Sequence, residues 1–218
     1  TASLFTPTPT LTPLPSPTQI VTSTPSSTPT PRPTTPPVAT SDLISQYMEG
    51  LPEEPEGFEW KILPEQQMAV LIPDLWYFKQ EEYPDLLLDA VYVTQEDIDT
   101  MGRYSTGMAV FVYEDFEDNE DAEQFALRLL VQQSNLSTTS EVISAWDYPF
   151  DSFLIHHLEI RGEYPYETEE NQHKIIHYTA LACNNNVYWT VFETPENQWD
   201  EMIEKYGILI DYVAVFAD

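Results

Sequence analysis

The first forty residues of this chain are too rich in proline and threonine to build a folded core. Residues 1–40 hold thirteen Thr, eleven Pro and five Ser, and no acidic residue. A segment with so few large apolar side chains cannot bury enough surface to offset the entropy that ordering costs. Repeats such as Thr6-Pro7-Thr8-Pro9 favour extended polyproline II geometry. We therefore expect residues 1–40 to form a disordered Pro/Thr-rich tether.

This tether indicates where the protein works. Ser/Thr-rich tracts with Pro are typical of glycosylated stalks on exported proteins. The sequence begins at Thr1 rather than Met, so we expect a processed form from which a leader was removed. A Thr/Pro spacer at a mature N-terminus is typical of bacterial lipoproteins, in which a lipidated Cys precedes it. We expect an extracytoplasmic, cell-surface or periplasm-facing protein that meets the membrane only through an N-terminal lipid anchor. A linker between cytoplasmic domains is the alternative.

The rest of the chain is strongly acidic. All 37 acidic residues and seven of the eight basic ones lie in residues 41–218. Such a charge repels nucleic acid and anionic membrane surfaces, and it attracts cations or basic partners. We therefore exclude nucleic acid as a partner, while the charge alone would also serve to keep an exported domain soluble. The single cysteine, Cys183, lies in an apolar run, so we expect it to be buried and no intramolecular disulfide to form.

The pattern of apolar runs and turn residues predicts an α+β domain, residues 58–218, after a lead-in segment, residues 41–57. Strands are expected where short apolar runs lie between Pro, Gly, Asp and Asn. The expected strands are Phe58–Leu63, Met68–Ile72, Trp76–Lys79, Leu86–Thr94, Thr106–Tyr113, Glu141–Trp146, Phe153–Ile160, Lys174–Cys183 and Val187–Phe192. The triplet Asn184-Asn185-Asn186 predicts a tight hairpin between the last two.

Three helical segments are expected among these strands. Gln95–Met101 would be a short insertion, and a longer helix with an acidic first turn would follow Asp118. Apolar residues near a period of 3.6 predict one long C-terminal amphipathic helix, bent at Gly207. They are Trp199, Met202, Ile203, Tyr206, Ile210, Val213 and Ala214.

Two blocks of the sequence are similar to the PsbP-like superfamily. The first is Trp60-Lys-Ile-Leu-Pro-Glu-Gln-Gln-Met-Ala-Val-Leu-Ile-Pro-Asp-Leu-Trp76, and the second runs from Asn186 through Pro195 and Trp199 to Leu209. That superfamily includes the photosystem oxygen-evolving subunit P, the Mog family and many bacterial lipoproteins. The resemblance implies an αβα sandwich with a central antiparallel sheet. Members of that superfamily act largely through binding and assembly and share no catalytic set, so we expect a non-catalytic binding or assembly module without a cofactor. The resemblance does not transfer a partner. Together with the tether, it leads us to expect a protein or small ligand at the cell surface.

Histidines offer one candidate metal site. If the strands around His157 and His177 form a hairpin centred near Glu167, these two residues lie opposite each other. His173 would then lie four residues along on the same face as His177. Three imidazoles so placed would suit a transition metal. A polar pair on a solvated sheet face is the alternative.

An acidic loop offers a second candidate metal site. Asp115, Glu117, Asp118 and Asp121 concentrate oxygen ligands of the kind that calcium prefers. The order of residues does not match an EF-hand, so weak calcium binding is the most that the loop predicts. Capping of the following helix by a solvated loop explains the same residues without a metal.

No catalytic motif is present in the sequence. It contains no Gly-x-Ser-x-Gly elbow, phosphate-binding glycine loop, His-Glu-x-x-His pattern or paired-cysteine metal motif. We therefore expect a protein that is not an enzyme, with a hydrolase of unrecognised site as the alternative. Aromatic residues near turns offer contact points for a partner. Tyr164 and Tyr166 are the candidates for a partner-facing loop, and some rings of the run Trp146 to Phe150 are expected to stay exposed.

Overall fold

The computed structural model describes residues 48–102, 104–135, 140–150, 153–163, 173–211 and 213–216. The chain divides into two units, Thr1–Pro37 and Val38–Asp218. The expected tether and residues 41–47 of the lead-in segment lie outside the described residues. Within the lead-in segment, residues 48–50 are helical.

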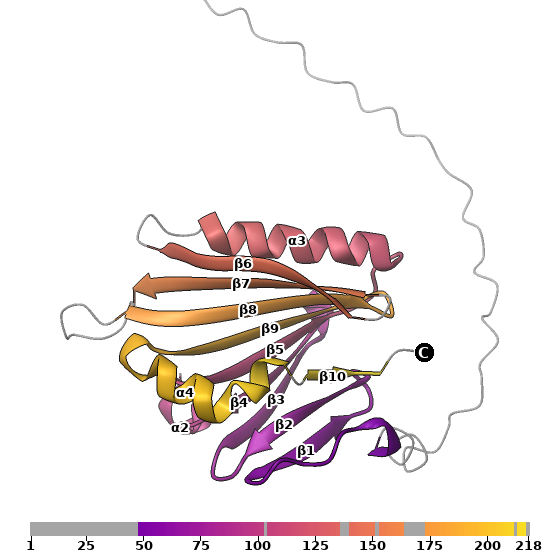
Figure 1. Cartoon of the computed structure of the whole chain (residues 1–218). Helices are drawn as coiled ribbons and strands as arrows, with labels where there is room; N and C mark the ends of the chain where they lie inside the picture. The colour runs from indigo at the N-terminus through magenta and orange to yellow at the C-terminus, as the bar shows by residue number, and fades with distance from the viewer. Residues whose placement is uncertain are drawn as a thin grey trace, which may run out of the picture. The chain divides into compact units, whose positions relative to one another are not determined.

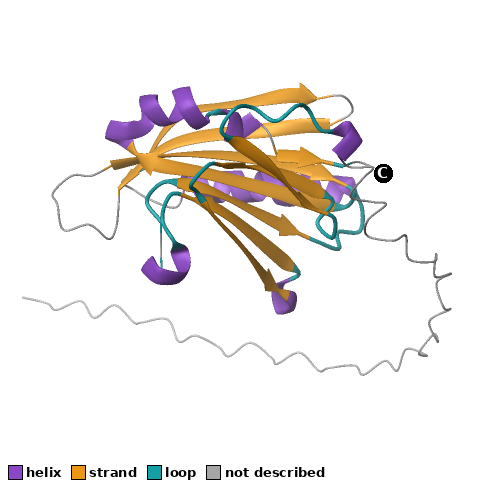
Figure 2. Ribbon diagram, turned by 90° about the horizontal axis from the view of Figure 1, so that it is seen from below, coloured by secondary structure: helices purple, strands orange, loops and turns teal. Residues whose placement is uncertain are grey.

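A seven-stranded antiparallel sheet forms the centre of the second unit (Figure 1). Its strands follow the order β3-β4-β5-β9-β8-β7-β6, so three strands from the middle of the chain lie beside four from later segments. They twist progressively across the sheet (Figure 2), as the handedness of the backbone requires. The strands are β3 (Tyr77–Tyr83), β4 (Leu88–Thr94), β5 (Gly107–Tyr113), β6 (Glu141–Phe150), β7 (Phe153–Glu163), β8 (His173–Cys183) and β9 (Asn186–Pro195).

A second, three-stranded antiparallel sheet has the order β1-β2-β10. Its strands are β1 (Phe58–Leu63), β2 (Met68–Pro73) and β10 (Val213–Val215). The central strand β2 is buried along its whole length. The helical segments are η1 (Pro84–Leu86), α2 (Ile98–Met101), α3 (Asn119–Asn135), η2 (Glu196–Gln198), α4 (Trp199–Tyr206) and α5 (Ile208–Asp211).

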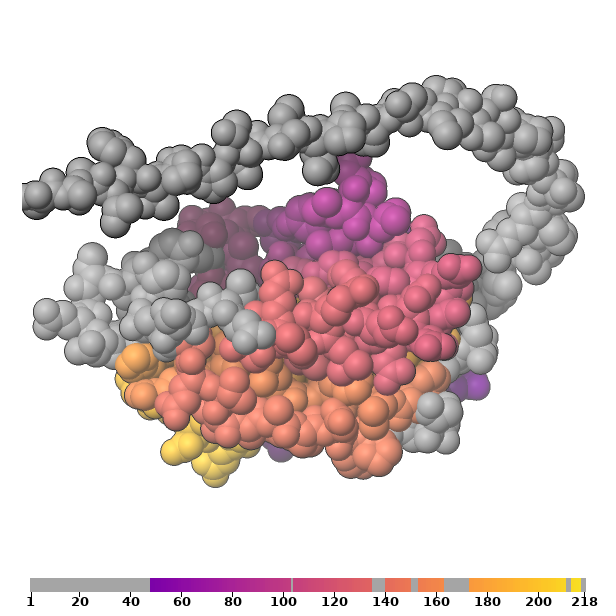
Figure 3. Space-filling model, turned by 90° about the horizontal axis from the view of Figure 1, so that it is seen from above, coloured from indigo at the N-terminus to yellow at the C-terminus, as the bar shows by residue number. Residues whose placement is uncertain are grey.

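Apolar contacts cover the middle strands of the large sheet on both faces. On one face, α3 packs over β7, β8 and β9 and buries alanines 122 and 126 against Trp189. Figure 3 looks onto this side and shows α3 beside the strands that follow it. On the other face, the three-stranded sheet, α4 and α5 share one core with β4, β5 and β9. The largest fully buried side chains, Tyr188 and Phe192, belong to this second core.

A turn of two asparagines ties the two sheets together. Asn184 and Asn185 have φ of 54° and 58°, the left-handed conformation that a tight hairpin between β8 and β9 requires. The Asn184 Nδ2 donates to Gln67 Oε1 at 2.7 Å and to the Phe216 carbonyl at 2.9 Å. The turn of one sheet therefore anchors both the β1–β2 turn and the chain beyond β10 of the other.

The expected α+β class and central antiparallel sheet are confirmed. Helices lie on both faces of the large sheet, but the three-stranded sheet shares one of these faces with α4 and α5. The short insertion appears as α2, the acidic helix as α3 and the asparagine hairpin as expected. Strands β6 to β9 extend beyond the expected bounds, because their polar ends pair although they bury little apolar surface.

The expectation of one long C-terminal helix was wrong. Helix α4 ends at Tyr206, α5 ends at Asp211, and Val213–Val215 pairs with β2 as a strand. A Cβ at Gly207 would lie 2.5 Å from the Ile203 carbonyl oxygen, so the bend at this position depends on glycine. The short apolar run Val213–Val215 suits a strand as well as a helix, and pairing with the edge of β2 decides for a strand.

The buried hydroxyl of Tyr188 gives a test of the link between the sheets. It donates to the Gln66 carbonyl at 3.0 Å, while the Tyr188 side chain is 2% exposed. Tyr188→Phe should lower the free energy of unfolding by about 1–2 kcal/mol, because a buried carbonyl loses a donor. Tyr77→Phe, at an exposed tyrosine, should change it by less than about 0.5 kcal/mol. Urea unfolding of both variants measures the difference, and equal values would contradict this role.

Candidate functional site

A shallow pocket of about 530 Å³, open to solvent over much of its extent, lies between the large sheet and the α4–α5 segment. Glu159 from β7 and His177 from β8 form its polar side, and they are direct cross-strand partners. The helical side is mostly apolar. It consists of Trp199, Ile203, Gly207, Ile208 and Ile210.

The alternation of the strands places the two polar residues in this pocket. Neighbouring β8 residues, Ile176 and Tyr178, belong to the core under α3, so His177 between them faces the opposite side. On the helical side, Trp199 and Ile203 are four residues apart and share one face of α4. The break at Gly207 then turns Ile208 toward the same pocket.

A cluster of aromatic rings continues from the pocket toward β6. The His157 Nδ1 and His177 Nε2 atoms are 3.2 Å apart, within hydrogen-bond distance. The Trp146 ring stacks on His157 with 4.8 Å between centroids and 4° between planes. It meets His177 edge to face, with centroids 5.4 Å apart. We call Trp146, His157, His177 and Glu159 the sheet cluster.

Burial controls the charge of this cluster. It lowers the pKa of His177 to about 4, and the neighbouring His157 acts in the same direction. It also raises the pKa of the Glu159 carboxyl. His177 is therefore neutral near pH 7, so its 3.6 Å contact with Glu159 Oε2 is not an ion pair there.

The expected histidine register was wrong by two residues. His157 lies opposite Thr179, while His177 lies opposite Glu159 and His173 opposite Glu163. A slip of two residues keeps every side chain on its face, so His157 and His177 still meet as diagonal neighbours. Among the described residues, no group of three or more His, Cys, Asp or Glu side chains is close enough to hold a metal ion.

The neighbouring His156 lies on the opposite face of β7, as adjacent strand residues must. Its Nδ1 is 2.8 Å from Asp147 Oδ1 on β6, and its Nε2 is 3.6 Å from Glu123 Oε1 on α3. The His156 side chain is 5% exposed. It therefore joins α3 to the edge of the sheet and takes no part in the pocket.

The acidic loop caps α3. The Asp118 Oδ1 accepts a hydrogen bond of 2.9 Å from the Asp121 backbone amide, which is the expected capping role. Asp115 has a φ of 64° and begins the loop, and Glu117 lies between these residues. Weak calcium binding by these four residues stays a prediction.

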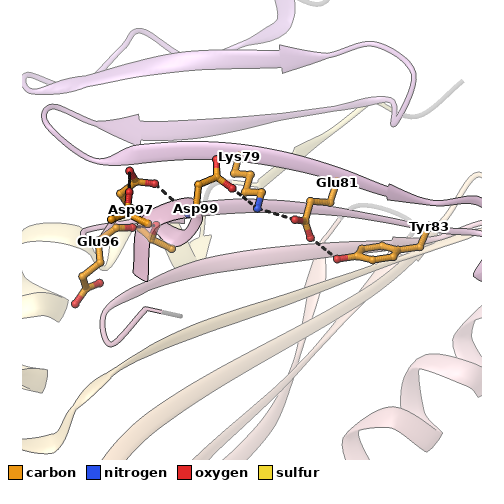
Figure 4. Close-up of polar contacts among 8 residues, drawn as sticks. Lys79, Glu81, Tyr83, Glu96, Asp97 and Asp99 are labelled. Carbon is orange, nitrogen blue, oxygen red and sulfur yellow. Dashed lines mark hydrogen bonds and ion pairs between the residues drawn. The ribbon is translucent and has the colours of Figure 1, made fainter. Parts of the chain in front are cut away.

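A second charged cluster fastens α2 to the sheet (Figure 4). The Lys79 Nζ lies 2.5 Å from Asp99 on α2 and 2.7 Å from Glu81 on its own strand. Tyr83 donates to the same Glu81 carboxylate, and Asp97 accepts from the Asp99 amide at 3.0 Å. These hydrogen bonds raise the pKa of Lys79 and lower that of Glu81. Lys79 is the one cation among the labelled residues, and each of the four carboxylates accepts an ion pair or a hydrogen bond from a nearby group, which supports a structural role.

Strand β6 presents exposed aromatic residues at the edge of the sheet. Trp146 is 43% exposed and Tyr148 55% exposed, which confirms that rings in this run stay accessible. The register of β6 shifts between Val142 and Ser144, and Pro149 stands near its end. The other expected contact residues, Tyr164 and Tyr166, lie outside the described residues.

Comparison with solved structures identifies the fold. The solution structure of cyanobacterial PsbP (CyanoP) from Synechocystis sp. PCC 6803 is similar with a TM-score of 0.52, over 73% of this chain and 93% of that one, at 15% identity. This chain has the PsbP-like fold. A Pseudomonas aeruginosa protein of unknown function, PA94, gives a TM-score of 0.40 at 11% identity, over 70% of this chain and 93% of that one. No protein-family model matches the chain, and no curated protein matches its sequence.

Sequence reasoning missed the pocket of this PsbP-like domain. Glu159 carries no motif, and the pocket's apolar wall was assigned to one continuous helix. The one sequence signal is that His157, Glu159 and Arg161 alternate along one face of β7, and this polar pattern is equally typical of a sheet face exposed to solvent.

The burial of neutral His177 predicts a pH dependence of stability. Its folded pKa of about 4 is below the ordinary value of 6.5, so the unfolded chain binds a proton that the folded chain does not. Stability is therefore full above the unfolded pKa and falls as the pH drops from 6.5 toward 4. The full effect of this one group is about 3 kcal/mol.

His177→Gln should remove this part of the pH dependence. The free energy of unfolding is measured at pH 7 and pH 4 for the wild-type chain and the variant. The acidic residues are the same in both, so the difference between the two pH dependences reports on His177. An NMR titration of the histidine rings gives an independent check. A His177 ring that titrates near its ordinary pKa would contradict the assignment.

The acidic loop can be tested by melting the full chain with calcium and with magnesium at equal ionic strength. Calcium binding by Asp115, Glu117, Asp118 and Asp121 would raise the melting temperature by several degrees more than magnesium does. Because Asp118 already caps α3, the predicted binding is weak, and most of the rise should come from screening of the acidic surface, which both ions provide. A calcium-selective rise that Glu117→Gln abolishes would establish the binding site, and equal rises with the two ions would contradict it.

Proposed function

We propose that this chain is a non-catalytic binding module whose pocket between the large sheet and α4–α5 receives a ligand. The pocket itself carries the proposal. It combines a mostly apolar wall with two polar groups, Glu159 and His177, on rigid neighbouring strands. Small-molecule sites are typically of this size and composition, with few polar groups that fix the orientation of the ligand.

The chemistry of the lining supports binding rather than turnover. Among the residues that line the pocket, none is a Ser, Thr, Cys or Lys that would serve as a nucleophile. A hydrolase with His177 as general base is the alternative. Burial gives that imidazole a pKa of about 4, so it would be a weak base near neutral pH.

The proposed site of action is outside the cytoplasm. The Pro/Thr composition of residues 1–40 supports a tether of the kind found on exported proteins, with an N-terminal lipid anchor. Among the described residues, no helix has the length and apolar character to cross a bilayer. Protease added to intact host cells should digest the chain, whereas protection until the cells are lysed would contradict this location.

A fragment screen tests the binding function. Ligand-observed NMR with a set of small fragments of mixed charge should find molecules that bind the full chain. Ile208→Trp fills the pocket and should weaken their binding at least about tenfold, whereas Leu127→Ala, on the exposed face of α3, should not.

The same samples separate binding from catalysis. Fragments that bind should be recovered unchanged after prolonged incubation. Conversion of a fragment to product at a rate that falls with His177→Gln would overturn the non-catalytic assignment. Equal binding by the wild-type chain and the Ile208→Trp variant would place the ligand elsewhere.

A further inference from the structure

The pocket holds a carboxylate whose charge is balanced by no cation among the described residues. The Glu159 side chain is only 18% exposed, and among the described residues its ionisable contact within 4 Å is His177, at 3.6 Å. His177 is neutral at physiological pH because it is buried. Burial alone shifts the pKa of Glu159, and no neighbouring positive charge opposes this shift.

The nearest basic side chains are engaged elsewhere. Arg161, two residues along β7 from Glu159, lies 2.8 Å from Glu196. Lys174, on the neighbouring strand, is bonded to Glu193. Glu159 thus differs from Glu193 on the neighbouring part of the sheet, because the chain supplies a cation to Glu193 but leaves Glu159 facing a pocket.

We propose that the pocket binds an organic cation: a protonated amine pairs with Glu159, and its hydrocarbon body lies against Trp199 and the neighbouring isoleucines. This inference rests on the proposed binding function and adds the class of ligand. A buried carboxylate gains a charge-assisted hydrogen bond when an ammonium reaches it. The apolar wall, with Ile203 and Ile208, gains the burial of the hydrocarbon.

Two further observations favour an organic cation over other ligands. The net charge of −29 repels anions and raises the local concentration of cations near the surface. Hard metal ions require several oxygen ligands, and Glu159 is the only carboxylate of the pocket lining. An amine needs one carboxylate and an apolar surface, which is what the pocket presents.

Matched probes test the role of charge. 2-Phenylethylamine and 2-phenylethanol have similar size and shape, but only the first is a cation at pH 7.5. Calorimetric titration of the full chain should show the amine binding at least about tenfold more tightly than the alcohol. Glu159→Gln keeps the shape of the side chain and should abolish this preference. Glu82→Gln removes one charge from an exposed position and should leave it intact.

The outcomes separate this inference from the proposed function. Equal affinity for the amine and the alcohol, or an amine preference that survives Glu159→Gln, would overturn the inference while the pocket remains a binding site. Absence of amine binding would also overturn it. If neutral or acidic molecules of the fragment set still bind in an Ile208-dependent manner, the binding function stands, and if no fragment of any charge binds, both fail.

Discussion

The need to bury both faces of one wide antiparallel sheet governs this structure. A seven-stranded sheet leaves two large apolar surfaces that water must not reach, and each is covered by different means. A single helix, α3, covers β7 to β9 on one face with small residues such as Ala122 and Ala126, which allow close approach. The short helices α4 and α5 are too small to cover the other face. The three-stranded sheet from both ends of the domain completes that cover, and β2 is consequently buried throughout.

The pocket lies on the face of the large sheet that the small sheet, α4 and α5 cover, at the point where the covering element changes from the small sheet to the α4–α5 segment. Over β4, β5 and β9, the small sheet and Met202 fill the space around Tyr188 and Phe192. Over β7 and β8, the covering residues come from the broken α4–α5 segment, and the sheet presents Glu159 and His177 in place of apolar side chains. Burying such groups opposes folding unless they are neutral or paired. Burial of Glu159 and His177 therefore lowers the stability of the fold at the pocket, and such locally unfavourable residues are often found at binding sites.

Most of the sheet could be predicted from the sequence, because its signals are local. Period-two apolar runs and turn residues gave the strands, and the asparagine triplet gave the β8–β9 hairpin. Contacts between distant segments were the difficult part. The conformation of Val213–Val215 depends on pairing with β2, more than 140 residues away in sequence. The histidine register depends on where β7 ends and β8 begins, which the apolar pattern does not mark. The pocket needs both the break at Gly207 and the face of β7, so no single segment reveals it.

The irregular edge strand β6 opposes pairing of the large sheet with the sheet of a second copy of this chain. The register shift at Val142 to Ser144 and the ring of Pro149 interrupt the regular row of donors and acceptors that another strand would need. Asp147 adds a charge that an incoming strand of a second copy would have to meet. Natural sheets use such features against edge-to-edge aggregation. Trp146 and Tyr148 can therefore stay exposed on the edge strand without promoting strand pairing between copies of the chain at high concentration.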